Sequence, residues 1–163
     1  MITEKDFTEI YNAHASKIFR LCLGYAQGDE DLSKEWLQET FIKVWNHRKS
    51  FNKESSVSTW IYRIAVNVCL GDLRKPKKTI SLKENNIPDQ IEEEHQDNQN
   101  KDINKLYGCI NQLTEQNKAL ILLELEDIPQ ATIAETVGLA HNAIRTRLSR
   151  IRKALLKCMT NGK

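Results

Sequence analysis

The sequence contains few residues that interrupt helices, with only three prolines and six glycines among 163 residues. Residues that favour helices fill most of the remainder, so we expect a mostly α-helical fold. No stretch approaches the roughly 18 consecutive apolar residues that a transmembrane helix needs. The N-terminal segment also lacks the apolar run of a signal peptide. We therefore expect a cytoplasmic protein with no membrane insertion of its own.

Cysteine is scarce as well, and the four cysteines are widely separated: Cys22, Cys69, Cys109 and Cys158. Zinc sites need Cys or His residues in close pairs. We therefore expect no metal site, and interpret these residues as reduced thiols that pack like small apolar side chains. The chain also lacks a nucleophile beside a positioned base, a glycine-rich phosphate loop and a carboxylate pair in a recognisable setting. We expect neither a cofactor nor enzymatic activity.

Charge is distributed unevenly, although the net charge is only +2. Residues 1–76 are close to neutral, whereas residues 77–104 are rich in acidic and polar side chains and poor in apolar ones. The last part of the chain, residues 141–163, holds seven Lys or Arg and no Asp or Glu. A segment as polar as 77–104 cannot bury enough apolar surface to offset its ordering entropy. We predict two domains, 1–76 and 105–163, joined by a flexible acidic linker.

Apolar residues recur at helical spacing in both predicted domains. In the first domain the pattern predicts helices over 5–27, 31–48 and 58–75, with Pro76 ending the third. In the second domain Thr114 can cap a helix, Pro129 lies at the start of another, and a long helix covers about 141–157. The expected fold class is all-α, with two small helical domains.

The basic end of the chain has the layout of a helix-turn-helix. Gly138 stands where a tight turn needs a residue that tolerates positive φ. The apolar residues of the following helix share one face: Ile144, Leu148, Ile151 and Leu155. In this motif the second helix enters the DNA major groove. The candidate contacts to base edges are His141, Asn142, Arg145 and Thr146, and those to phosphates include Arg147 and Arg150. A solvated basic face on an ordinary core helix is the alternative.

The segment from Glu30 to Trp45 resembles the polymerase-binding helix of bacterial sigma factors, whose pattern is D-x-x-Q-E-x-F followed by an aromatic residue. The matching residues are Glu35, Gln38, Glu39, Phe41 and Trp45. Glu35, Gln38 and Glu39 share one helix face, with Leu37, Phe41 and Val44 on the buried side. The resemblance implies that the polar face, together with Ile42, binds core RNA polymerase. A solvated acidic helix face is the alternative.

The segment from Ser58 to Lys75 resembles the helix with which sigma factors melt and read the minus-ten promoter element. The matching residues are Trp60, Arg63, Ile64, Ala65, Asn67 and Arg74. The resemblance implies that this helix and the preceding loop receive a flipped-out base, which costs a few kcal/mol to extract. Lys53, Ser56, Trp60, Arg63, Asn67 and Arg74 are therefore the candidate minus-ten contacts. Packing in the core is the alternative for Trp60.

The order of these segments is that of the extracytoplasmic-function (ECF) subfamily of sigma factors, which has region 2, a linker and region 4. The resemblance implies a factor that directs promoter-specific initiation, with the basic helix on the minus-thirty-five element. The implied partners are core RNA polymerase, promoter DNA and an anti-sigma factor. A helix-turn-helix regulator that does not bind polymerase is the alternative function, and an enzyme with a DNA-binding tail is a third.

Overall fold

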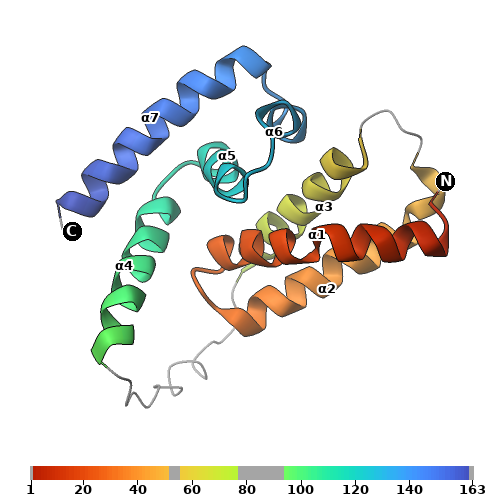
Figure 1. Cartoon of the computed structure of the whole chain (residues 1–163), viewed down its shortest axis with the longest axis horizontal. Coiled ribbons are helices and arrows are strands. Elements are labelled where there is room, and N and C mark those ends of the chain that lie inside the picture. The colour runs from red at the N-terminus through yellow and green to blue at the C-terminus, as the bar shows by residue number, and fades with distance from the viewer. Residues whose placement is uncertain (1, 52–55, 77–93, 162–163) are drawn as a thin grey trace.

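The computed structural model describes residues 2–51, 56–76 and 94–161, and the regular elements within these ranges are all helical. Figure 1 shows how they are arranged. The elements are α1 (Glu4–Tyr25), α2 (Glu30–Asn46), the short 3₁₀ helix η1 (Arg48–Ser50), α3 (Val57–Leu73), α4 (Glu94–Asn111), α5 (Glu115–Leu125), α6 (Gln130–Val137) and α7 (His141–Thr160). The all-α prediction is confirmed, with α1 to α3 in the first small domain and α4 to α7 in the second.

Short polar side chains begin four of these helices, because a side-chain oxygen can accept a bond from a free backbone N–H of the first turn. Thr3 and Asp6 form a reciprocal capping box at α1. Asp29 caps α2, and Ser56 caps α3. Thr114 caps α5 as predicted, by accepting a bond of 3.2 Å from the backbone N–H of Asn117.

The helix-turn-helix geometry depends on one glycine. Gly138 follows α6 with φ of 77°, in the left-handed region that residues with a Cβ rarely adopt. The chain therefore reverses sharply, and α7 begins three residues later at His141. Ile144, Leu148, Ile151 and Leu155 are all buried along one face of α7, as predicted.

Helix α4 starts at Glu94, so residues 94–104, the last part of the predicted linker, are helical in the structure. Low apolar content suggested disorder there, but Ile110 is fully buried in the C-terminal half of the helix. Once a helix is anchored by packing, extending it costs far less than nucleating it. The packed C-terminal half of α4 therefore stabilises the helical conformation of its polar N-terminal half. Residues 77–93, the rest of the expected linker, lie outside the described residues.

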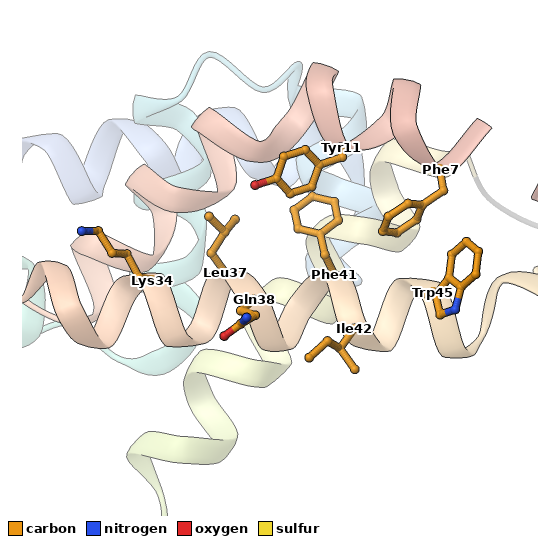
Figure 2. A pocket seen from close by; sticks show the side chains of 8 residues that line it. All are labelled: Phe7, Tyr11, Lys34, Leu37, Gln38, Phe41, Ile42 and Trp45. Atoms are coloured by element: carbon orange, nitrogen blue, oxygen red, sulfur yellow. The ribbon is translucent and has the colours of Figure 1, made fainter. Parts of the chain in front are cut away.

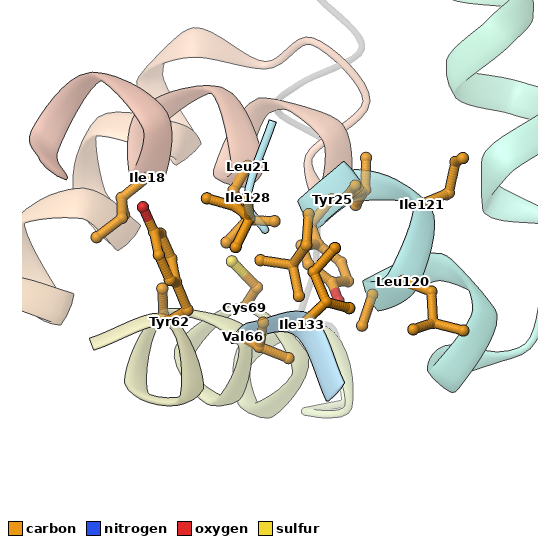
Figure 3. Close-up of a cluster of buried hydrophobic side chains, with 14 of the residues drawn as sticks. Ile18, Leu21, Tyr25, Tyr62, Val66, Cys69, Leu120, Ile121, Ile128 and Ile133 are labelled. Atoms are coloured by element: carbon orange, nitrogen blue, oxygen red, sulfur yellow. The ribbon is translucent and has the colours of Figure 1, made fainter. Parts of the chain in front are cut away.

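One buried core joins the two domains. Figure 3 shows side chains from α1 and α3 meeting side chains from the second domain. The labelled members are Ile18, Leu21, Tyr25, Tyr62, Val66, Cys69, Leu120, Ile121, Ile128 and Ile133. Helix α6 packs directly on α3, and α5 contacts α1. The second domain therefore covers an apolar face of the first.

The two domains approach each other closely at Gly24 of α1. A Cβ atom placed on Gly24 would lie only 2.3 Å from Cδ2 of Leu122 in α5. Leu122 is itself buried, with 4% of its surface exposed. Glycine is therefore the residue that lets α1 and α5 pack this closely.

The cysteines differ from the sequence interpretation. Cys109 of α4 and Cys158 of α7 form a disulfide, so the prediction of four reduced thiols was wrong for these two. Cys22 and Cys69 are free and buried, as predicted. The sequence did not predict this disulfide, because 49 positions separate the two cysteines and only the tertiary fold brings them together.

Candidate protein and nucleic-acid interfaces

Helix α2 presents the residues that were expected to bind polymerase. Glu35, Gln38, Glu39 and Ile42 are all exposed, and Ile42 exposes 52% of its surface, which is unusual for a large apolar side chain. The opposite face of α2 is buried against α1 and α3 through Ser33, Trp36, Thr40, Phe41 and Val44. The helix thus combines an acidic outer face with an exposed apolar residue.

An apolar groove of about 620 Å³ runs beside this face. Figure 2 shows its lining from two helices: Phe7 and Tyr11 of α1, and Lys34, Leu37, Gln38, Phe41, Ile42 and Trp45 of α2. The rings meet edge to face, with centroids of Phe7 and Trp45 at 5.1 Å and of Tyr11 and Phe41 at 4.7 Å. The groove is therefore built by aromatic packing.

The sequence did not predict this groove, because its wall combines residues of two helices, with Phe7 and Tyr11 contributed by α1. Leu37 was expected in the buried face of α2, but it is only partly buried and lines the groove instead. Trp36 occupies the core with 2% of its surface exposed. Its indole N–H donates to a carboxylate oxygen of Asp72 in α3 at 3.0 Å, which satisfies the polar atom that a buried indole carries.

Helix α3 presents most of the expected minus-ten contacts on its outer surface. Arg63 and Asn67 are exposed along α3, and Arg74 is exposed at its C-cap. Ser56 is the N-cap of the helix. Trp60 is partly buried, with its ring 4.8 Å from that of Phe51. Lys53 lies outside the described residues.

A second, polar hollow of about 390 Å³ lies between α2 and α3. It is lined by Glu39, Lys43, His47, Ile64, Asn67, Val68, Gly71, Asp72 and Lys75. Glu39 and Asn67, which were expected to contact different partners, therefore border the same hollow. The structure brings the two candidate surfaces of the first domain edge to edge.

Residues of the second domain form hydrogen bonds with side chains on the outer surface of α3. The Thr59 hydroxyl donates to a carboxylate oxygen of Glu135 in α6 at 2.8 Å, and the Arg63 guanidinium donates to the backbone carbonyl of Glu135. Arg74 makes a two-pronged contact with Glu115 of α5, with Nε and Oε2 at 3.1 Å. This contact lowers the pKa of Glu115 and raises that of Arg74. No sequence signal pointed to these pairs, because they join different domains.

Helix α7 presents the expected minus-thirty-five contacts. His141, Asn142, Arg145, Thr146 and Arg150 are exposed on its N-terminal half. Arg147 is partly buried and donates to the side-chain carbonyl of Gln116 in α5 at 2.7 Å. Further along, Arg152 pairs with Glu124 of α5. Since α7 itself carries no acidic residue, its outer surface is strongly basic, as DNA-binding helices are.

The described residues contain neither a metal-binding cluster nor a membrane-spanning helix. No group of three or more His, Cys, Asp or Glu side chains in that part of the chain is placed to hold a metal ion. None of the helices the structure describes is long and apolar enough to span a membrane.

Comparison with known proteins matches both halves of the chain. Residues 10–79 match the family model for sigma-70 region 2, and residues 103–155 match that for sigma-70 region 4. The ECF RNA polymerase sigma factor SigW of Bacillus subtilis is 26% identical over 93% of this chain and 87% of its own length. SigV, an RNA polymerase sigma factor of the same organism, is 26% identical over 87% of this chain and 84% of its own length.

Two solved structures share the fold. CnrH, solved in complex with the cytosolic domain of CnrY, has a TM-score of 0.73 at 15% identity and covers 99% of this chain and 92% of its own. The sigma factor RpoE, solved with the anti-sigma factor NepR from Bartonella quintana, has a TM-score of 0.69 at 20% identity, covering 98% of this chain and 99% of its own.

A helical domain with a region 2 match and a helix-turn-helix domain with a region 4 match define a promoter-recognising subunit of bacterial RNA polymerase. The chain belongs to the sigma-70 family and is a sigma factor of its ECF subfamily. It binds core RNA polymerase and directs promoter-specific initiation of transcription. A regulator that acts without polymerase is not favoured, because such a protein needs no region 2.

Proposed function

We propose that three surfaces of this sigma factor divide the work of initiation. The outer face of α2 docks on core polymerase, α3 reads the minus-ten element, and the N-terminal half of α7 reads the minus-thirty-five element. The first domain comprises residues 1–76, and the second is built around residues 105–163 with the rest of α4 attached. The acidic, partly apolar face of α2 is the observation that carries this assignment.

The polymerase contact combines charge and apolar burial. Glu35, Gln38 and Glu39 offer acceptors to a basic partner helix, and Ile42 offers an apolar side chain that is exposed in the free protein. The groove beside them is open and lined by aromatic rings. A partner that inserts an apolar side chain there removes that surface from water, which favours binding.

The minus-ten contact uses the exposed stripe of α3. Asn67 borders the polar hollow, where a base that leaves the duplex stack finds hydrogen-bonding groups. We assign Arg63 and Arg74 to backbone phosphates, and Ser56 and Lys53, at or before the start of the helix, to further contacts with the same element. Trp60 packs against Phe51, so we assign it a role in shaping this surface through core packing.

The minus-thirty-five contact follows the usual geometry of a helix-turn-helix. His141, Asn142, Arg145 and Thr146 lie at the start of α7, the part that enters the major groove. Arg147 directly follows them and Arg150 lies about one turn further on, and we assign both to phosphate contacts. With ~4 such contacts, the slope of log affinity against log salt concentration would be near −3.6.

These assignments require the two domains to separate on the promoter. The minus-ten and minus-thirty-five elements lie about 25 base pairs apart, or about 85 Å at 3.4 Å per pair. In the packed arrangement Arg63 and Arg74 contact Glu135 and Glu115 of the second domain. Promoter binding therefore has to replace these protein contacts with DNA contacts.

The remaining assignments concern regulation and location. Two proteins of the same fold were solved in complex with other proteins, one of them an anti-sigma factor, and we assign an anti-sigma partner to this chain as well. A subunit of RNA polymerase acts on the chromosome, so the protein works in the cytoplasm. It performs no covalent chemistry itself, because the polymerase forms the bonds.

The polymerase assignment is tested by reversing one charge. Glu39→Lys puts a cation on the docking face, and we expect the affinity for core polymerase to fall at least tenfold. Glu9→Lys makes the same change on the exposed surface of α1, away from the groove, and should bind as wild type does. The measurement is binding of purified core polymerase to each immobilised protein. Equal binding by both variants would overturn the assignment.

A further inference from the structure

The four cysteines form two pairs with different chemistry. Cys109 in α4 and Cys158 in the last turns of α7 are joined by a disulfide, with their Cα atoms 6.0 Å apart. Cys22 in α1 and Cys69 in α3 are free thiols whose sulfurs lie 3.7 Å apart. One molecule therefore carries a bonded pair in its second domain and an unbonded pair in its first.

The two pairs also differ in how a reagent can reach them. Cys22 and Cys69 expose none of their surface. The hydrogen bond with Cys22 and burial both raise the pKa of Cys69. Because the thiolate is the reactive form, such a pair is inert. Cys158 is partly exposed near the end of α7, whereas Cys109 is 4% exposed behind it. Only the second pair has a partly exposed member.

The bonded pair ties together two helices that pack along each other. Partly buried apolar side chains of both helices, including Leu106 and Met159, pack against the same core as Cys109. Cys158 lies eight positions beyond Arg150, which is about 12 Å along a helix. The bond therefore holds the far end of α7 and leaves the proposed DNA-contacting end free.

We infer that Cys109 and Cys158 form a reversible thiol–disulfide site that locks α4 to the end of α7 when the cell becomes oxidising. This inference rests on the proposed cytoplasmic location, where thiols are normally kept reduced and a disulfide forms transiently. The partners in the exchange are small-molecule thiols and their disulfides. The oxidised state is the one that the structure describes.

The exchange balances with a small-molecule disulfide as the oxidant. The Cys158 thiolate attacks one sulfur of the oxidant, forms a mixed disulfide and expels one thiolate. The Cys109 sulfur then loses its proton and attacks the Cys158 sulfur, which expels the second thiolate. Two electrons pass from the protein to the oxidant, and the two protons of the protein thiols end on the two released small thiols. Excess thiol reverses both steps.

Closing the bond stabilises the second domain. The chain between the two cysteines contains α5, α6 and most of α7, so the bond restricts this whole unit when it unfolds. The reduced second domain should therefore melt earlier. The sequence preference of α7 should stay unchanged, because the bond lies away from its N-terminal half.

The test starts with the purified full-length chain equilibrated in mixtures of reduced and oxidised glutathione. Free thiols are trapped with a maleimide under denaturing conditions and counted by mass spectrometry. We expect two free thiols in oxidising mixtures and four in reducing ones, with the bond mapped to Cys109 and Cys158. The Tm of the wild type should fall by about 5–15 °C on reduction.

Two variants separate this site from a general effect of reductant. Cys158→Ser should have the same Tm with and without reductant. Cys69→Ala, which removes a thiol of the buried pair, should keep the shift even if its starting Tm is lower. A wild-type Tm that ignores reductant would overturn the inference, as would a bond mapped to Cys22 and Cys69.

The glutathione titration also tests whether the Cys109–Cys158 bond is reversible. A bond that stays closed in the most reducing glutathione mixture would be a permanent crosslink, and the switch would be refuted. These results come from the purified protein and do not depend on where it works. Finding the protein outside the cytoplasm by cell fractionation would refute the proposed location and leave the measured chemistry intact.

Discussion

Single side chains on α7 should differ in what they contribute to DNA binding. Arg145 lies on the first exposed turns of the helix, where side chains reach base edges, and Arg150 lies more than a turn beyond it. A base contact carries sequence information, whereas a phosphate contact adds affinity to every sequence. The two arginines can therefore be told apart by measurement.

Arg145→Ala should weaken binding of the holoenzyme to its preferred minus-thirty-five sequence by about 1–3 kcal/mol and relax discrimination there. Arg150→Ala should weaken binding to all sequences and reduce the salt slope by about one. Lys157→Ala, also exposed on α7 but at its far end, is the matched control and should have no effect. Titrations of promoter fragments at several salt concentrations give these values. Identical behaviour of both arginine variants would contradict the assignment.

A histidine in the first domain makes folding sensitive to pH. Nδ1 of His14 lies 3.2 Å from the hydroxyl oxygen of Tyr62 in α3. Burial, and then the nearby Lys17, lower the pKa of His14 below its ordinary value of 6.5. Burial also raises the pKa of Tyr62 to about 12, so the phenol stays protonated.

The sign of the pH effect follows from proton binding. Near pH 6.5 and below, the unfolded chain binds a proton at His14 more readily than the folded chain does, so the free energy of unfolding falls as the pH drops through 6.5. His14→Gln removes this titration and should flatten the loss of stability. Urea unfolding at pH 7.5 and 5.5 measures both proteins. An equal loss of stability in the two would show that His14 does not contribute.

Whole elements were predictable where a periodic pattern and a terminal signal agreed. In α7 the apolar spacing, the preceding Gly138 and the absence of acidic residues all pointed the same way, and the helix formed there. The polar N-terminal half of α4 has no apolar pattern that predicts a helix. The helix is stabilised by the packing of Ile110 in its C-terminal half, and the sequence of the N-terminal half gives no sign of that contact.

The contact between α1 and α5 offers a way to disturb one interface without unfolding either domain. Gly24→Ala places a Cβ against Leu122, and overpacking of this kind costs about 1–3 kcal/mol. Alanine also favours the helix itself by about 0.5–1 kcal/mol. We therefore expect α1 to stay folded while the domains separate, which small-angle scattering detects as a larger radius of gyration.

Gly71→Ala is the matched control, because a Cβ on Gly71 in α3 meets nothing within 4 Å. It should leave the radius of gyration unchanged. Leu122→Ala combined with Gly24→Ala should restore close packing by making room. Equal radii for the two single variants would show that Gly24 does not control the packing of the domains.

At the scale of the whole molecule, the arrangement of the domains was beyond the sequence. Motifs predicted the proposed docking face of α2 and the basic face of α7, but not the shared core or the groove between α1 and α2. The pairing of Arg74 with Glu115, like the Cys109–Cys158 bond, joins residues from different elements. Such contacts depend on tertiary packing, and a single sequence gives no pattern for them.

The most direct test of the sigma-factor function is run-off transcription with core polymerase free of other sigma factors, on a library of randomised promoters. We predict that adding this chain produces defined start sites. The selected templates should share one element near minus ten and one near minus thirty-five. Starts that are equally scattered with and without the chain would contradict the account.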